Sequence, residues 1–524
     1  MKGKRSLILL PFGGILTALC LIFPKVGLLQ WLTMIPALLW LFAAIFRDEK
    51  ISFGRLYGAG ALYFLPFYLT VYHWFFYLYP MEFAGLARGE AAALVVICWL
   101  GLSLLQTVAS ALTFPLFGLL SRTRPVRARP WLSPFLFAAL YTVFEWAQTF
   151  TWMGVPWARL PLGQSENGFL LGSAALFGSY FITFALVAVN GLLTFSLLRI
   201  DRARLCLVAA AAVFAVNAIA GGVGLALNRT DAGEPLKVAA VQGNIGSSGK
   251  WSEENNLQVL EVYEKYTAEA AAAGADVVVF PETFLPYDFD TVALYVARLA
   301  TEHRVTIMCG ALLCRDGKVY NGLFTVYPDG SVEKTVYAKR HLVPFGEYLP
   351  WRSVIKTLIP PLADLNIRAQ DLSPGEGSAV IRAPFGSVGG LICFDSIYES
   401  LTLDSVRDGA EILVLATNDS WFSDSAAVYM HSGQARLRAV ESGRWIVRSA
   451  DTGISSVIDP HGATHSELPP LVEGVSIATA YVDGARTLYS YIGNAFTYLL
   501  LAAVAVLPVT EAILFFKKRG NAPR

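Results

Sequence analysis

The sequence predicts a multi-pass α-helical membrane domain joined to an α/β sandwich domain. The 524 residues are 55% hydrophobic and only 15% charged, which is too apolar for an ordinary soluble protein. About eight stretches approach the ~20 apolar residues that span the ~30 Å hydrocarbon core of a bilayer. These stretches are unevenly distributed, and the long segment between the last two has ordinary charge density and alternating strand and helix patterns.

The predicted spans leave one large gap. About seven precede Asp231 and the eighth lies near the C-terminus, at residues 6–23, 27–46, 56–79, 91–120, 131–150, 169–198, 205–227 and 492–516. We therefore expect a transmembrane domain over 1–227, a water-soluble domain over 228–488, and a final helix with a basic tail over 489–524.

Lysine and arginine in the short loops predict the orientation, because positive loops stay on the cytoplasmic side. Every second loop is basic, which places both termini in the cytoplasm and the soluble domain outside. The run after Lys4 and Arg5 also has features of a signal peptide. An uncleaved first helix is the preferred interpretation, since no small-residue cleavage site follows and further spans do.

Charge and cysteine content exclude several classes of partner and site. The net charge of +1 leaves no basic face once the loop charges are set aside, which argues against a nucleic-acid partner. The six cysteines lack zinc-ligand spacing, so no metal is expected. Cys309 and Cys314 lie on opposite faces of a predicted strand, so a disulfide between them is not expected.

Short apolar, β-branched runs predict the strands of the soluble domain. They cover 238–242, 276–280, 306–312, 323–327, 388–392, 412–416 and 446–449. Amphipathic segments predict helices over 255–273 and 432–442, and the turn at 328–330 predicts a hairpin. This mixture indicates helices covering a sheet without determining the strand order.

Three strand ends carry candidate chemistry. Glu282 follows a buried strand, although a strand-terminal Glu is commonly a solvated or capping residue. Lys339 and Glu347 lie in a segment too rich in Val, Pro and Phe for a surface loop, although they also fit a surface ion pair. Cys393 ends an apolar strand just before Asp395, which favours the edge of a site over a buried core cysteine.

The three segments together resemble the nitrilase superfamily, whose members present a Glu, a Lys and a Cys in this order from three strand ends. With residues 241–245, Trp251, the 339–347 run and the flanking membrane helices, the resemblance narrows to bacterial apolipoprotein N-acyltransferases. The region from Glu145 to Gln164 is also similar to that family. The resemblance implies a nitrilase-like α-β-β-α sandwich.

The resemblance also implies a reaction. Glu282 would act as general base, Cys393 as nucleophile, and Lys339 would favour the thiolate and, with the backbone N–H of Phe394, stabilise the oxyanion. A phospholipid, expected to be phosphatidylethanolamine, would donate its acyl chain through a thioester on Cys393. The acceptor would be the α-amine of a diacylglyceryl-cysteine apolipoprotein, in the last step of lipoprotein maturation. No cofactor is needed.

The expected supporting or substrate-binding residues are Glu347, Trp251, Phe394, Asp395 and Trp421. Asp395 stands where the family pattern has a Glu, so its role stays open. Trp251 is expected near the acyl site or as a loop anchor, and Trp421 in the pocket or at the bilayer. Glu145, at the end of a predicted span, marks a functional or a structural polar contact.

The resemblance implies a location in the bacterial inner membrane, with the catalytic domain on the periplasmic side. One alternative is a membrane-tethered amidase or nitrilase that passes its thioester to water, since the same triad serves both chemistries. A second is a transporter or scaffold with an inactive outer domain. The predicted spans carry few ionisable residues apart from Glu145, which disfavours transport.

Overall fold

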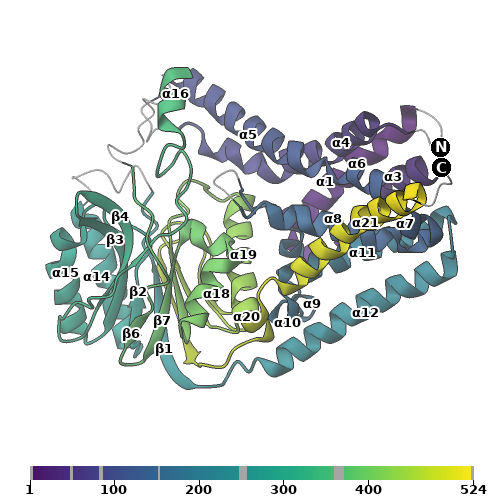
Figure 1. Ribbon diagram of the computed structural model, residues 1–524. Helices are drawn as coiled ribbons and strands as arrows, with labels where there is room; N and C mark the ends of the chain where they lie inside the picture. The colour runs from purple at the N-terminus through teal and green to yellow at the C-terminus, as the bar shows by residue number, and fades with distance from the viewer. Residues whose placement is uncertain are drawn as a thin grey trace. The chain divides into compact units, whose positions relative to one another are not determined.

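The computed structural model describes residues 4–47, 51–81, 86–150, 154–246, 256–358 and 371–520, arranged in two compact units. The first unit consists of Met1–His73, Ile97–Gly224 and Ile492–Arg524. The second consists of Trp74–Val96 and Leu225–Tyr491. Figure 1 shows helices throughout the first unit, and sheets with covering helices in the second.

The first unit is built from apolar helices. Its main helices are α1 (Leu9–Ile22), α3 (Ile35–Arg47), α4 (Phe53–Val71), α5 (Arg88–Ser110), α6 (Thr113–Leu120), α8 (Ser133–Ala147), α11 (Ser179–Leu198), α12 (Ala203–Leu227) and α21 (Ala495–Gly520). This confirms a membrane domain with several apolar helices. The first residues of α5, up to Val96, and the last residues of α12, from Leu225, belong to the second unit.

The expected number of eight spans is not confirmed. Among the described residues, five helices are long and apolar enough to cross a membrane: Pro24–Arg47, Arg88–Leu120, Ser179–Leu198, Ala203–Leu227 and Ala495–Ile513. Two predicted spans form shorter helices, α1 with 14 residues and α8 with 15. The 19-residue helix α4 is long enough, but Tyr, Gly, Pro and Arg lower its hydropathy.

Glu145 has partners inside the helical unit. Its Oε1 accepts a hydrogen bond from the backbone N–H of Leu160 at 2.8 Å, and its Oε2 accepts one from the hydroxyl of Thr183. Arg159 is also buried, donates to Ser179 Oγ at 2.5 Å and lies over the ring of Tyr180. These contacts satisfy polar groups where water is scarce, so they favour the structural interpretation of Glu145.

The second unit contains two sheets that are each six-stranded in its described residues. The first has the order β12 (Gly474–Val482), β1 (Glu234–Gln242), β2 (Val277–Val279), β3 (Thr306–Arg315), β4 (Lys318–Val326), β5 (Tyr337–Ala338). The second has the order β11 (Thr464–Leu468), β10 (Ser455–Ile458), β9 (Ile446–Ala450), β8 (Ile412–Thr417), β7 (Gly386–Ile392), β6 (Ile381–Ala383).

The sheets pack face to face between helices, which confirms the predicted α-β-β-α sandwich (Figure 1). Alternate residues of β1 point to opposite faces, so Val238 and Ala240 join the core between the sheets, whereas Ala239 and Val241 pack toward α14 (Asn256–Ala272) and α15 (Phe289–His303). Helices α18 (Glu399–Arg407) and α19 (Ala426–Ser442) cover the second sheet.

The parallel strand pairs bring the candidate residues to one edge of each sheet. Strand β2 runs parallel to β1 and β3, and β7 runs parallel to β8, which runs parallel to β9. The carboxyl ends of parallel strands lie at the same edge, where α/β proteins place their sites. Glu282 follows β2, Cys393 follows β7, and Asn418 and Asp419 follow β8.

Candidate active site

Glu282 is held in a fixed position by three donors. Its Oε1 accepts hydrogen bonds from Asn321 Nδ2 at 2.6 Å and from Lys339 Nζ at 3.0 Å. Its Oε2 accepts one from the backbone N–H of Asn418 at 2.9 Å. The segment also passes very close to β3, where a Cβ on Gly310 would lie 2.6 Å from the Cα of Glu282. Glu282 is therefore an oriented carboxylate and not a solvated strand end.

Lys339 lies between two carboxylates. Its side chain is 1% exposed, and Nζ lies 3.0 Å from Glu282 Oε1 and 2.9 Å from Glu347 Oε1. The other oxygen of Glu347 accepts a hydrogen bond from the N–H of Val343 at 2.8 Å. This geometry excludes the surface ion-pair interpretation.

Two effects act on the pKa of Lys339 in opposite directions. Burial lowers the pKa, whereas the charges of Glu282 and Glu347 raise it, and the net result is a pKa above the usual range. Lys339 therefore stays a cation. With both carboxylates ionised, the three side chains together carry one buried negative charge.

Cys393 follows β7 in an unusual backbone conformation. Its φ is +48°, in the left-handed region that non-glycine residues rarely adopt. Burial raises the pKa of its thiol, the charge of Glu282 raises it further, and Lys339 opposes both. The thiol is therefore protonated at rest, and forming a thiolate requires a base.

Asp395 joins the nucleophile turn to the Lys339 segment. Its carboxylate is fully buried and accepts four hydrogen bonds, from the hydroxyl of Tyr337 and from the backbone N–H groups of Arg340, His341 and Ile392, at 2.8 to 3.3 Å. Burial raises the pKa of Asp395 to about 6, so it is ionised at neutral pH. The shorter Asp therefore makes a complete set of contacts where the family pattern has a Glu.

The remaining expected residues differ in what the structure shows of them. The ring of Phe394 meets Tyr398 edge-on, with centroids 5.6 Å apart. Trp421 is half-buried in the loop after β8, and its neighbour Phe422 packs edge-on against Trp74 of the same unit. Trp251 lies outside the described residues.

Several polar residues of the site escaped the sequence analysis. Asn321 lies on β4 and donates to Glu282, and also to Glu347 at 3.4 Å. The other residues are Asn418, Asp419, His431 and Arg448, which lie near Cys393 or Glu282. Arg448 was detectable as a charged residue inside the predicted strand 446–449, whereas Asn321 lies just before the predicted strand 323–327. Burying such groups is costly unless they are paired.

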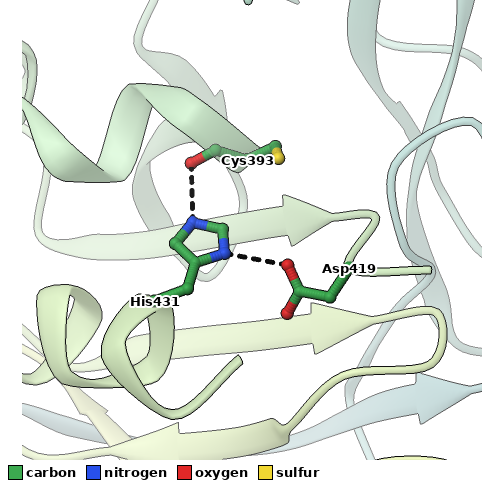
Figure 2. Close-up of side chains that lie close together, drawn as sticks. All are labelled: Cys393, Asp419 and His431. Carbon is green, nitrogen blue, oxygen red and sulfur yellow. Dashed lines mark hydrogen bonds and ion pairs between the residues drawn. The ribbon is translucent and has the colours of Figure 1, made fainter. Parts of the chain in front are cut away.

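Cys393, Asp419 and His431 form a geometric cluster, with ligand atoms within 4.8 Å of one another (Figure 2). Such a cluster can hold a metal ion, but here a guanidinium lies against it. Arg448 Nη2 is 2.7 Å from Asp419 Oδ2 and 3.3 Å from His431 Nδ1. Because a cation already compensates this carboxylate, the arrangement favours a hydrogen-bonded network over a metal centre.

Comparisons with known proteins cover almost the whole chain. Residues 237–488 match the carbon-nitrogen hydrolase family, and residues 13–192 match the apolipoprotein N-acyltransferase N-terminal domain. An apolipoprotein N-acyltransferase of Gloeobacter violaceus is 32% identical, with 94% of this chain and 91% of that protein covered. One from Geobacter metallireducens is 30% identical, with 99% and 96% covered.

Among solved structures, Saccharomyces cerevisiae Nit3, a member of branch 10 of the nitrilase superfamily, is 22% identical. The match covers 49% of this chain and 93% of Nit3, with a TM-score of 0.37.

Proposed function

The chain belongs to the apolipoprotein N-acyltransferase family and acylates lipoproteins at an amino group, and from this premise we propose that Cys393, Glu282 and Lys339 carry the transfer. The observation that carries the proposal is the buried Glu282–Lys339–Glu347 cluster beside a protonated thiol at a strand end. An oriented carboxylate, a fixed cation and a thiol are the groups that acyl transfer through a thioester requires.

In the first half-reaction, Glu282 takes the proton of Cys393 as the sulfur attacks the ester carbonyl of a phospholipid acyl chain. The proton moves within one buried cluster, so its net charge does not change and no additional charge is desolvated. Lys339 Nζ and the N–H of Phe394 stabilise the oxyanion. The intermediate then collapses to a thioester, and Glu282 returns its proton to the departing lysophospholipid. Phosphatidylethanolamine is the proposed donor.

In the second half-reaction, the α-amine of a diacylglyceryl-cysteine apolipoprotein attacks the thioester. Glu282 accepts a proton from the amine, the C–S bond breaks, and the amide forms while Cys393 regains a proton. Lys339 acts in both halves without changing its own protonation, because two carboxylates keep it charged. General-base catalysis of this kind contributes about 10²–10⁴-fold to the rate.

Discharge of the acyl-enzyme distinguishes this function from that of a membrane-tethered amidase. We expect the detergent-purified protein to keep its acyl group in water and to lose it when a diacylglyceryl-cysteine peptide is added. The same peptide with an acetylated α-amine is the control and should leave the acyl group in place. Mass spectrometry measures the acyl group that remains on the protein with each peptide. Equal discharge with and without the free amine would indicate a hydrolase.

We also propose that residues 1–227 and 489–524 hold the chain in the bacterial inner membrane, with both termini cytoplasmic and residues 228–488 on the periplasmic side. The alternation of basic loops supports this orientation. Cys314 is an exposed, free thiol of the catalytic domain and offers a direct test. A membrane-impermeant maleimide should label it in spheroplasts. Labelling only after lysis would reverse the orientation.

A further inference from the structure

A buried network lies behind Cys393, outside the Glu282–Lys339–Glu347 cluster. His431 Nδ1 is 2.8 Å from Asp419 Oδ1, and Asp419 Oδ2 accepts a hydrogen bond from Arg448. On the other side of the ring, Nε2 is 3.2 Å from the carbonyl oxygen of Cys393 and 3.0 Å from Ser396 Oγ (Figure 2). The Ser396 hydroxyl donates to the same carbonyl at 2.8 Å.

We propose that His431, held by Asp419 and Arg448, is a positioning residue that fixes the Cys393–Phe394 peptide and thereby aims the Phe394 N–H at the oxyanion. The inference rests on the proposed function of Cys393. His431 touches the main chain of the nucleophile and takes no proton from the substrate.

The geometry of the peptide group connects the carbonyl contact to the oxyanion. A peptide unit is planar and trans, so its C=O and N–H point in opposite directions. Holding the carbonyl oxygen of Cys393 from behind therefore determines where the N–H of Phe394 points. It also supports the left-handed φ of +48° at Cys393, a strained conformation for a non-glycine residue.

Burial and hydrogen bonds hold the three side chains of this network in place. His431, Asp419 and Arg448 are each at most 1% exposed, and Arg448 also donates to the carbonyl of Ile454. Burial raises the pKa of Asp419, but Arg448 and His431 lower it by more than burial raises it. The net pKa of Asp419 therefore lies below the usual range. Asp419 is therefore a permanent acceptor for Nδ1–H, and since the Cys393 carbonyl also only accepts, the ring holds it by donating from Nε2, with a proton on each nitrogen.

The same loop also holds the base. Asn418 donates its backbone N–H to Glu282 Oε2, and the next residue, Asp419, holds His431. Two consecutive residues after β8 thus place Glu282 and the Cys393–Phe394 peptide relative to one another. A Cβ on Gly453 would lie 2.1 Å from Asp419 Oδ2, so this close approach requires glycine.

Two reactions of Cys393 can show whether a variant affects the position of the oxyanion donor or the reactivity of the thiol. Alkylation by iodoacetamide forms no oxyanion, whereas acylation by phospholipid does. His431→Ala should slow acylation about 10²-fold, the lower range for a lost oxyanion-hole donor. It should change the alkylation rate less than about threefold. His431→Gln, whose amide can donate to the same carbonyl, should recover about tenfold of the loss.

A matched control is His465→Ala, which removes another histidine paired with a carboxylate in the same unit, His465 Nε2 to Asp459 Oδ2 at 2.8 Å. It should leave both rates unchanged. Parallel loss of acylation and alkylation in His431→Ala and His431→Gln would overturn the inference, as would wild-type acylation in His431→Ala. Absence of acylation at Cys393 in the wild-type protein would instead refute the proposed function. If His431→Ala does not fold, the test rests on His431→Gln. In that variant acylation must fall further below its wild-type rate than alkylation falls below its own.

Discussion

Replacing Lys339 by Met is expected to reduce acyl-enzyme formation about 10³-fold and to destabilise the catalytic domain by about 3–5 kcal/mol. The reaction loses a cation at the oxyanion. The folded state loses the ion that separates Glu282 from Glu347, both of which lie within 3.0 Å of Nζ. Two buried carboxylates without a cation repel each other. Acylation is measured by mass spectrometry, and stability by the midpoint of thermal aggregation in detergent.

The double variant Lys339→Met, Glu347→Gln separates these two effects. Neutralising Glu347 removes the like-charge repulsion, so the aggregation midpoint should recover while acylation stays low. The control is Lys265→Met, which breaks the exposed pair Lys265–Glu473 and should leave the aggregation midpoint close to that of the wild type, because exposed ion pairs contribute little to stability. Recovery of acylation in the double variant would show that Lys339 is only a structural counter-ion.

Replacing Glu282 by Gln should lower acylation about 10³-fold, within the range for a lost general base, and at the same time make the Cys393 thiol more acidic. Acylation falls because Gln cannot accept the proton. The pKa of the thiol falls because the negative charge of Glu282 is one of the causes that raise it. The pH midpoint of iodoacetamide labelling at Cys393 should therefore move to lower pH, and labelling at a fixed pH below the midpoint should increase.

Lys339→Met provides the opposite shift, because the ammonium lowers the pKa of the thiol and its loss should move the labelling midpoint to higher pH. The two variants thus lose acylation together but shift thiol acidity in opposite directions. Labelling midpoints that move in the same direction would contradict the proposed electrostatic arrangement around Cys393.

The local pattern of apolar residues was sufficient to predict the strands that carry the site. The apolar runs before Glu282 and Cys393 form β2 and β7, because residues buried on both faces leave a continuous hydrophobic signal. Helix α19 begins at Ala426, six residues before the predicted start, after Ser425 caps its first turn. Helix α15 was missed although its apolar residues recur at helical spacing, Phe289, Val292, Val296 and Leu299.

The polar contacts of the site could not be predicted in the same way. Asn321 meets Glu282 across 39 residues of chain, and Asp419 meets Arg448 across 29, so no local spacing connects them. The role of Asp395 also depends on chain geometry, because its acceptors are filled by backbone N–H groups from two separate segments. The predicted number of eight spans is not confirmed within the described residues, because apolar runs such as the one around α8 form helices shorter than a bilayer requires.

The location of the acyl group tests most directly whether Cys393 is the nucleophile. The protein is incubated with a phospholipid carrying an isotope-labelled acyl chain, digested, and analysed by peptide mass spectrometry, with Cys393→Ser and Cys309→Ser in parallel. Cys309 is a fully buried thiol on β3 and serves as the control. We expect a hydroxylamine-sensitive label on the Cys393 peptide in the wild type and in Cys309→Ser, and no such label in Cys393→Ser. Full transfer activity in Cys393→Ser, or a label on another residue, would contradict this role of Cys393.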